Sequence, residues 1–447
     1  LVQGLADTMR VQLDLALERL GDGPAVDYDR CVIASTGTTA KEADTKSELE
    51  QVRHLLGEIG EKVRPGNEGL LEAIDAWRGR TWVGHEGIDR ANQRVIAELE
   101  ALVEKNFLPH VPEELRGVPR SNVRFLTIQE AWFSGSMNYI GRARTRDGTP
   151  EYEAEYEINA RIQKSQAEFS HLVAHEVVPG HVTTFAYLQH LHHIGRLGFE
   201  ATILTMNTRH STLFEGVANA GLMLAHGVIA PDQLPSPELR LGMLLAQLED
   251  IAKNNASFYT YAAGMPADEI KRRLRRDCLS TQERADKLTD SWAKHPLMGR
   301  AYMPSYLFGT TLVLDLLRKH GPAKLVPVLY GNHRGVPVRY RWRVLAAPDG
   351  GDYTWTFAEG VLACAEHYRF RYVDDRAPTF VAFVPGDYVL EAELTPAFDD
   401  DLARYGSTTA RLVVAVSGDA IEREAEGCQL GGPTPAAIPL GLVLLVG

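Results

Sequence analysis

The chain has 447 residues, with 47 Lys and Arg against 59 Asp and Glu and a formal net charge of −12. This acidic balance argues against a nucleic-acid partner or an anionic membrane, which both require a basic face. The content of 45% hydrophobic and 24% charged residues is typical of a globular protein. No apolar run approaches the ~20 residues that span a bilayer. Four scattered cysteines without a Cys-x-x-Cys pair indicate neither a disulfide scaffold nor a thiolate zinc cluster.

Residues 1–330 are predicted to form one helix after another. Near the start, apolar residues recur every three or four positions, as on one face of a helix: Leu5, Met9, Leu13, Leu17 and Leu20. A similar stripe runs over 49–63, where Thr45 and Glu48 are predicted to form a capping box. Ser236, followed by Pro237, is predicted to start another helix. Further helices are expected at 88–105, 155–178, 182–194, 210–226, 267–277 and 305–320.

After about residue 330 the pattern changes to alternation with a period of two, which is typical of strands. Strands are expected at 339–344, 352–357, 367–373, 380–383, 388–394 and 411–417. The segment 331–337 is expected to be a loop between two domains, because Gly331, Gly335 and Pro337 disfavour regular structure. The sequence therefore predicts a mainly α protein: a large helical domain at 1–332 and a small antiparallel β-sandwich-like region at 333–447.

The most informative segment runs from His171 to His181 and ends His175-Glu176-Val177-Val178-Pro179-Gly180-His181. Imidazole is a good zinc ligand, and an adjacent Glu that does not bind the metal can take a proton from the zinc-bound water. Six residues of straight helix would turn His181 about 240° away from His175. Pro179 and Gly180 allow a break that could bring the two rings back together. His171, four residues before His175 on the same face, is the alternative partner.

A third ligand is expected from another helix. Glu215 lies in an otherwise small and apolar segment, Phe214 to Gly221, and a buried carboxylate requires a cation or a proton donor nearby. A salt bridge to Arg209 is the structural alternative. Asn219, one helical turn after Glu215, could orient a metal ligand from the second layer.

Taken in order, His175-Glu176-x-x-Pro179-Gly180-His181, Glu215-Gly216-x-Ala218 and Tyr302-x-x-x-Tyr306-x-x-Gly309 resemble the domain-of-unknown-function 885 family of bacterial, largely helical zinc hydrolases. These are similar to the gluzincin metallopeptidases, and the resemblance covers roughly 1–330. It implies that His175, His181 and Glu215 bind zinc and that Glu176 is the general base. It also implies that a late tyrosine, best matched by Tyr306, stabilises the oxyanion. Where many family members have a second His after the motif, this chain has Val182.

Independently of the family, Arg300, Tyr302 and Tyr306 are candidate catalytic residues at the start of a late helix. A phenol can donate to an oxyanion, and Arg can pair with a substrate carboxylate. Packing in the core is the alternative role for these side chains. His190, His192, His193 and His210 are expected to lie on a solvated face or to pack locally.

The leading hypothesis is a zinc-dependent hydrolase that cleaves a peptide or related amide bond by Glu176-assisted attack of zinc-bound water. Two alternatives remain: a zinc enzyme acting on a non-peptide small molecule, and a catalytically inactive helical binding module. Neither a nucleic acid nor a membrane is expected as partner. The cysteine pattern favours the cytoplasm, and a secreted protein is the alternative if the chain beginning at Leu1 has been trimmed.

Overall fold

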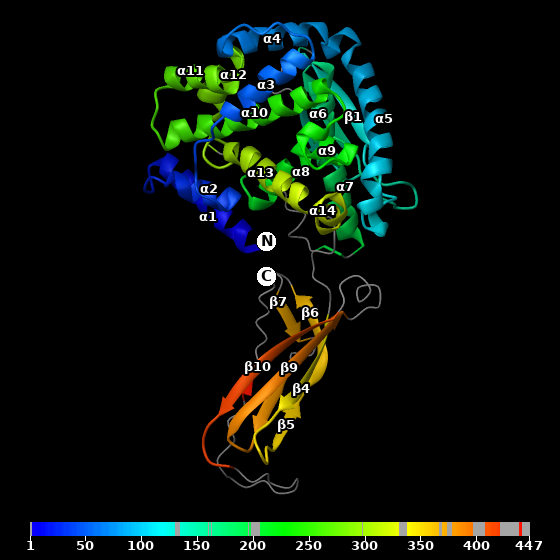
Figure 1. Cartoon of the computed structure of the whole chain (residues 1–447), viewed down its shortest axis with the longest axis vertical. Coiled ribbons are helices and arrows are strands. Elements are labelled where there is room, and N and C mark those ends of the chain that lie inside the picture. The colour runs from blue at the N-terminus through cyan, green and yellow to red at the C-terminus, as the bar shows by residue number, and fades with distance from the viewer. Residues whose placement is uncertain are drawn as a thin grey trace. The chain divides into compact units, whose positions relative to one another are not determined.

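The computed structural model describes residues 2–129, 135–159, 161, 163–194, 196–197, 206–296, 298–329, 338–365, 369–372, 378–396, 407–420 and 438–439. The described chain is mainly α-helical with a few small sheets, which confirms the predicted fold class. It divides into two compact units, Leu1–Gly331 and Asn332–Gly447 (Figure 1). The loop expected at 331–337 lies outside the described residues. Within the described part, no helix is long and apolar enough to cross a membrane.

The first unit is built from helices and one small sheet (Figure 1). The helices are α1 (Val2–Leu20), α2 (Tyr28–Thr36), α3 (Lys46–Glu58), α4 (Gly66–Arg80), α5 (Ile88–Asn106), α6 (Gln166–Glu176), α7 (His181–His193), α8 (Arg209–Asn219), α9 (Gly221–His226), α10 (Pro237–Tyr261), α11 (Ala267–Cys278), α12 (Gln282–Asp286), α13 (Met303–His320) and α14 (Pro322–Leu329). Single turns lie at Val83–His85, Leu108–His110, Glu113–Leu115 and Pro231–Gln233, and a short π-helix at Lys287–Trp292. The long helix α10 packs against α3, α6, α11 and α13.

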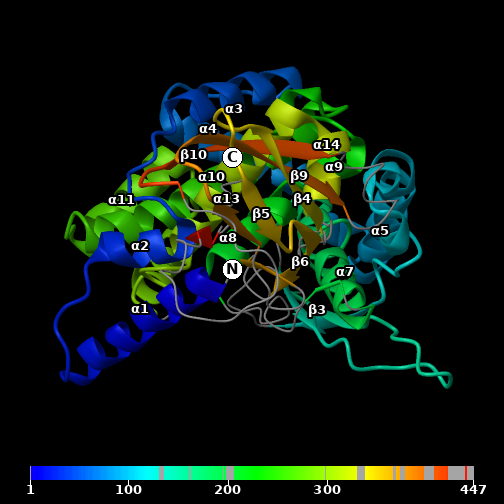
Figure 2. The same cartoon turned by 90° about the horizontal axis from the view of Figure 1, so that it is seen from below.

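The expectation of helices throughout 1–330 was wrong over residues 123–159. Three strands lie there: β1 (Val123–Ile128), β2 (Gly135–Tyr139) and β3 (Ala154–Asn159), in the order β1-β3-β2. Along β3, buried residues alternate with partly exposed ones, as a strand requires. The segment between β2 and β3, closed by a bridge between Arg144 and Pro150, protrudes from the helices (teal in Figure 2).

The predicted helix 155–178 therefore begins eleven residues later than expected, at Gln166. Its start is a capping box, which the sequence analysis missed: the Ser165 hydroxyl accepts from the Glu168 N–H at 3.1 Å, and Glu168 accepts from the Ser165 N–H at 3.0 Å. The box predicted at Thr45 does not form, because the Asp44 carboxylate accepts from the backbone N–H of Thr45. The predicted cap at Ser236 is confirmed.

A buried ion pair anchors the start of α6. The Arg78 guanidinium on α4 donates to Glu168 at 2.6 Å, and the Glu168 side chain is 3% exposed. Burial alone would raise the pKa of Glu168, but Arg78, Lys164 and the capping hydrogen bond outweigh it and lower the pKa to about 2.

This pair predicts a pH dependence of stability. Because the folded pKa of Glu168 lies below its unfolded value of about 4.5, the stabilisation is complete above pH 4.5 and is lost as the pH falls towards 2. At ~1.4 kcal/mol per pKa unit, we expect a loss of roughly 3 kcal/mol. In urea unfolding at several pH values, Glu168→Gln should flatten this slope, whereas Asp14→Asn, which breaks the exposed pair with Arg30, should not. An unchanged slope in Glu168→Gln would contradict this account.

In the described part of the second unit, antiparallel strands form two sheets, in agreement with the β-rich region expected there. The strands are β4 (Val338–Ala346), β5 (Tyr353–Thr356), β6 (Glu359–Ala365), β7 (Arg369–Tyr372), β8 (Thr379–Ala382), β9 (Gly386–Pro396), β10 (Thr408–Val416) and β11 (Ile438–Pro439). One sheet has the order β10-β9-β4-β6-β7 and the other β11-β8-β5. Trp342 of the first sheet stacks on Trp355 of the second, so the sheets share one aromatic core.

Candidate metal centre

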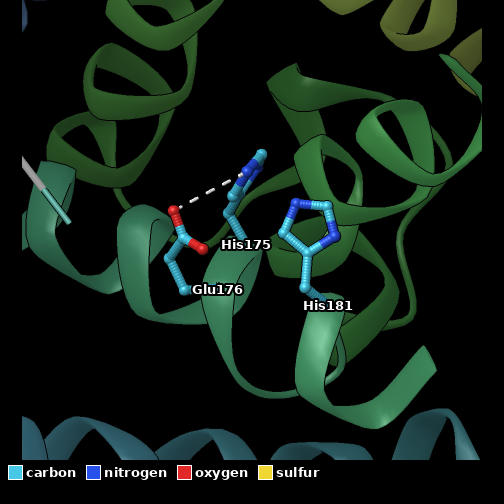
Figure 3. A group of neighbouring side chains, drawn as sticks. All are labelled: His175, Glu176 and His181. Atoms are coloured by element: carbon cyan, nitrogen blue, oxygen red, sulfur yellow. Dashed lines mark ion pairs between the residues drawn. The ribbon is translucent and has the colours of Figure 1, made fainter. Parts of the chain in front are cut away.

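The candidate centre lies where α6 ends and α7 begins. Helix α6 ends at Glu176, the chain passes Pro179, and α7 starts at His181. The break brings the rings of His175 and His181 to a centroid distance of 4.7 Å, with Glu176 beside them (Figure 3). The break at Pro179 and Gly180 therefore brings together two imidazoles that are six residues apart, as the sequence analysis expected.

Gly180 makes this break possible. A Cβ at this position would lie 1.8 Å from the carbonyl oxygen of His175 and 2.4 Å from that of Ala174. These are backbone atoms of α6, so they cannot move aside as a side chain could. The chain can only return this closely past the end of α6 because residue 180 has no side chain.

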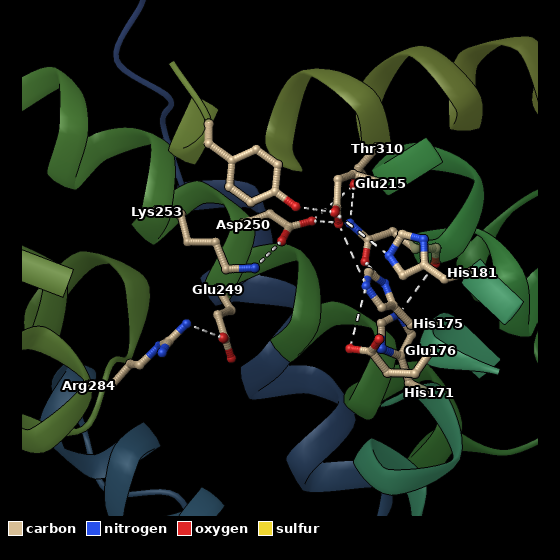
Figure 4. A network of polar contacts seen from close by, with 12 residues as sticks. His171, His175, Glu176, His181, Glu215, Glu249, Asp250, Lys253, Arg284 and Thr310 are labelled. Atoms are coloured by element: carbon tan, nitrogen blue, oxygen red, sulfur yellow. Dashed lines mark hydrogen bonds and ion pairs between the residues drawn. The ribbon is translucent and has the colours of Figure 1, made fainter. Parts of the chain in front are cut away.

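Glu215 of α8 meets both rings. Its Oε2 lies 3.6 Å from His175 Nε2, and its Oε1 lies 3.7 Å from His181 Nε2 (Figure 4). Donor atoms bound tetrahedrally at 2.0–2.2 Å from a zinc ion would be about 3.4 Å apart. Glu215 is buried, and its Oε2 has no hydrogen-bond partner among the described residues. A buried carboxylate with one oxygen near each imidazole nitrogen, and with the oxygen beside His175 unpaired, fits a divalent cation.

Glu176 also lies close to the rings, slightly further from His175 than Glu215 does. Its Oε1 is 3.9 Å from His175 Nε2, and His175, Glu176 and His181 also form a group that could hold a metal. Two carboxylates therefore face the rings, but Glu215 has an oxygen close to each imidazole. Either carboxylate could therefore complete a group with the two imidazoles.

The charges of the centre separate the two carboxylates. Burial raises the pKa of Glu176 to about 7, and the nearby Glu215 adds to this rise. Burial also opposes ionisation of Glu215, but His181, His175 and the Tyr302 hydroxyl overcome it and lower the pKa to about 2. Burial and the neighbouring His181 lower the pKa of His175 to about 3, so its ring is neutral. Glu215 is thus an anion at neutral pH, whereas the pKa of Glu176 lies near neutral pH, as suits a general base.

The two rings are held in different ways. His175 Nδ1 lies 2.7 Å from Asn219 Oδ1, so this nitrogen carries the proton and Nε2 keeps a free lone pair. The predicted second-layer position of Asn219 matches this contact. His181 is stacked on Phe185, with an interplanar angle of 8°.

His171 is directed elsewhere. Its Nε2 lies 3.3 Å from the backbone carbonyl oxygen of Asn219, to which it donates. Burial lowers its pKa to about 4, so the ring is neutral. Because this nitrogen is engaged by a carbonyl, the geometry favours His181 over His171 as the partner of His175.

The three predicted residues at the late helix have three different positions. The Tyr302 hydroxyl donates to Glu215 Oε1 at 2.5 Å, so it holds a ligand and is engaged. The Tyr306 ring packs beside Tyr302, with centroids 5.1 Å apart, and lies under Lys253 Nζ at 3.4 Å. Arg300 pairs instead with Glu18 of α1 at 2.6 and 2.8 Å, and no contact joins it to the other candidate residues in the described chain.

A close crossing of α8 and α13 sets the distance between Glu215 and Tyr302. A Cβ on Gly216 would lie 2.1 Å from the carbonyl oxygen of Gly309, and a Cβ on Gly309 would lie 2.0 Å from that of Thr212. The two backbones therefore touch at this point. Gly216, which follows Glu215, and Gly309, which ends the tyrosine segment, therefore both serve the close packing of the two helices.

Sequence reasoning missed the polar residues behind the centre. Asp250 and Lys253 of α10 and Thr310 of α13 are buried behind the candidate ligands (Figure 4), and Asp250 and Thr310 accept from the side chain of Asn219. Asp250 and Lys253 are three residues apart and joined at 3.2 Å, and this spacing of opposite charges on one face of the long helix 237–261 was the available signal. Thr310 had no local signal.

Comparisons with known proteins add little. No family model matches the sequence, and no curated protein matches it. Among solved structures, a candidate lipoprotein from Colwellia psychrerythraea is 18% identical with a TM-score of 0.48, covering 68% of this chain and 52% of that one. A candidate lipoprotein of unknown function from Shewanella oneidensis is 14% identical with a TM-score of 0.47, covering 72% and 58%. The chain spans little more than half the length of these neighbours, and they are too distant to assign a family or function.

Proposed function

We propose that this chain is a zinc-dependent hydrolase that cleaves a peptide or related amide bond. The observation that supports this most is the position of the buried Glu215 carboxylate, whose Oε2 lies 3.6 Å from His175 Nε2 and whose Oε1 lies 3.7 Å from His181 Nε2. Two imidazoles and one carboxylate are a common ligand set of catalytic zinc, which leaves one position open. A zinc ion bound there would supply Lewis-acid catalysis.

The protein side chains divide the remaining work. Glu176, whose Oε1 lies 3.9 Å from His175 Nε2, takes the proton from the attacking water and passes it to the leaving amine. Tyr306 is the candidate oxyanion donor, because Tyr302 is engaged by Glu215. Asn219 fixes the ring of His175. Arg300, which pairs with Glu18, has no part in this proposal.

Zinc loading tests the proposal directly. Chelator-treated protein titrated with zinc chloride should take up one equivalent, and His181→Ala should reduce this affinity by several orders of magnitude because one of three ligands is lost. His190→Ala is the matched control on the same helix, since His190 contacts the Tyr152 hydroxyl. If the wild-type protein takes up no zinc at neutral pH, the proposal fails. If zinc binds and only non-peptide substrates are hydrolysed, the small-molecule alternative holds.

The two tyrosines should respond differently. Tyr306→Phe should lower kcat by about 10²–10³-fold and leave zinc affinity unchanged, since it removes an oxyanion donor. Tyr302→Phe should weaken zinc binding about 10-fold or more, because Glu215 loses the hydrogen bond from the Tyr302 hydroxyl. Parallel measurement of kcat and zinc affinity separates the roles. Equal effects of both substitutions on zinc affinity would contradict this division.

We also propose a cytoplasmic location, on the cysteine pattern. Cys31 and Cys278 are buried free thiols, which is compatible with a reducing compartment. Fractionation of the native host, followed by immunoblotting, measures the location directly.

A further inference from the structure

The side-chain amide of Asn219 joins the candidate metal centre to a buried polar network. Its Oδ1 faces His175 Nδ1 at 2.7 Å, and its Nδ2 faces both Asp250 Oδ2 at 2.8 Å and Thr310 Oγ1 at 2.7 Å. Asn219, Asp250 and Thr310 are 5%, 4% and 4% exposed. Water therefore has little access to these groups, and the direction of each hydrogen bond is set by the protein.

An amide can face His175 in two ways, and only one suits a metal ligand. With the oxygen towards the ring, His175 Nδ1 must carry the proton, and Nε2 is left with a lone pair directed at Glu215. With the NH₂ towards the ring, Nδ1 must accept, and the proton moves to Nε2. That tautomer cannot bind a cation through Nε2.

Asp250 decides between these orientations. An ionised carboxylate only accepts hydrogen bonds, so it attracts the NH₂ of Asn219 and repels its oxygen. Burial raises the pKa of Asp250 to about 6, but Lys253 Nζ donates to its other oxygen at 3.2 Å and opposes this rise, so the carboxyl is ionised at neutral pH. Glu249, the preceding residue, accepts a hydrogen bond from Arg284.

Thr310 acts in the same direction. Its hydroxyl donates to Asp250 Oδ2 at 2.9 Å, so its oxygen is left to accept from Asn219 Nδ2. Both hydrogens of the amide therefore have fixed acceptors. The flipped amide would place its oxygen against a carboxylate and a hydroxyl whose proton is already used.

We propose that Asp250 and Thr310 are positioning residues that lock the Asn219 amide and thereby keep His175 in the tautomer that can bind a metal through Nε2. The link to zinc rests on the proposed function, but the tautomer of His175 is a property of the metal-free chain as well. His175 of α6 is therefore oriented by residues of three other helices, α8, α10 and α13.

Asp250→Asn tests the lock, because a neutral amide at 250 can present either an oxygen or an NH₂ to Asn219. We expect zinc affinity to fall about 10–100-fold, the usual range for loss of an outer partner. In the metal-free protein, ¹⁵N NMR of the His175 ring should change from the Nδ1–H tautomer to a mixture of both.

An exchange variant supplies the matched control. In Asn219→Asp/Asp250→Asn, the carboxylate at 219 can only accept from His175, so the amide at 250 no longer has to be oriented by a charge. We expect this double variant to recover the Nδ1–H tautomer and most of the zinc affinity. If Asp250 were only structural, Asp250→Asn would lower the free energy of unfolding and leave the Nδ1–H tautomer unmixed.

Thr310 gives a second test if Asp250→Asn does not fold. Thr310→Val, nearly equal in shape, should loosen the tautomer preference, and Thr310→Ser should retain it. A single Nδ1–H tautomer in both Asp250→Asn and Thr310→Val would overturn the inference. If the wild-type protein takes up no zinc, the proposed function fails, and the NMR signal of the metal-free protein still decides on the lock.

Discussion

Replacing Glu176 by glutamine is expected to preserve zinc binding and to lower turnover by about 10²–10⁴-fold, the range for loss of a general base. The substitution keeps the shape of the side chain and removes its ability to take a proton. The Glu176 oxygen lies 3.9 Å from His175 Nε2, whereas Glu215 has an oxygen near each ring. The ligand set should therefore survive. Metal content and kcat measured on the same preparations check this expectation.

Glu168→Gln is the matched control for this experiment. It makes the same chemical change in the same helix and at a buried position, but Glu168 pairs with Arg78. We expect it to lower stability and to leave kcat at low temperature close to that of the wild-type protein. If Glu176→Gln loses zinc together with activity, Glu176 is a ligand, and the centre is the alternative group of His175, Glu176 and His181.

Gly180→Ala is expected to abolish high-affinity zinc binding. A methyl group at this position would overlap the carbonyl oxygen of His175 at 1.8 Å, so the start of α7 would have to move away from the end of α6. The displacement would carry His181 away from Glu215. We expect the free energy of unfolding to fall by at least about 1–3 kcal/mol, as for overpacking elsewhere. The free energy of zinc binding should fall by more than this.

Zinc titration and urea unfolding of the metal-free protein measure the two effects separately. Gly57→Ala is the control, because a Cβ at this exposed position of α3 would meet no atom within 4 Å. It should stabilise the helix by about 0.5–1 kcal/mol. Zinc affinity equal to that of the wild-type protein in Gly180→Ala would show that the break does not depend on glycine.

The helices were predictable wherever a stripe of apolar residues recurs on one face, as for α5, α7 and α11. Strand β3 was missed because its alternating residues, Tyr156 and Ile158, run directly into the apolar pattern of α6. The capping pair Ser165 and Glu168 was the local signal that separates the two elements. A capping box is thus better evidence for a helix start than the apolar pattern alone.

The candidate centre was predictable in part. His175, Glu176 and His181 are close in sequence, and Glu215 stands out as a charge in an apolar segment; the structure brings them together. The network behind them was not predictable, because Asn219 meets Asp250 and Thr310 across 31 and 91 residues. No periodicity or spacing encodes such contacts. The misplacement of Arg300 has the same origin, since its partner Glu18 is 282 residues away.

The crossing at Gly216 and Gly309 has a consequence for how this protein can change over evolution. Because two main chains are in direct contact there, the interval between α8 and α13 is insensitive to which side chains surround them. Substitution of the surrounding side chains should therefore leave Glu215 and the Tyr302 hydroxyl at their present separation. A methyl group added at either glycine would force the two helices apart. A mutant library that varies the residues around this crossing should therefore keep both glycines.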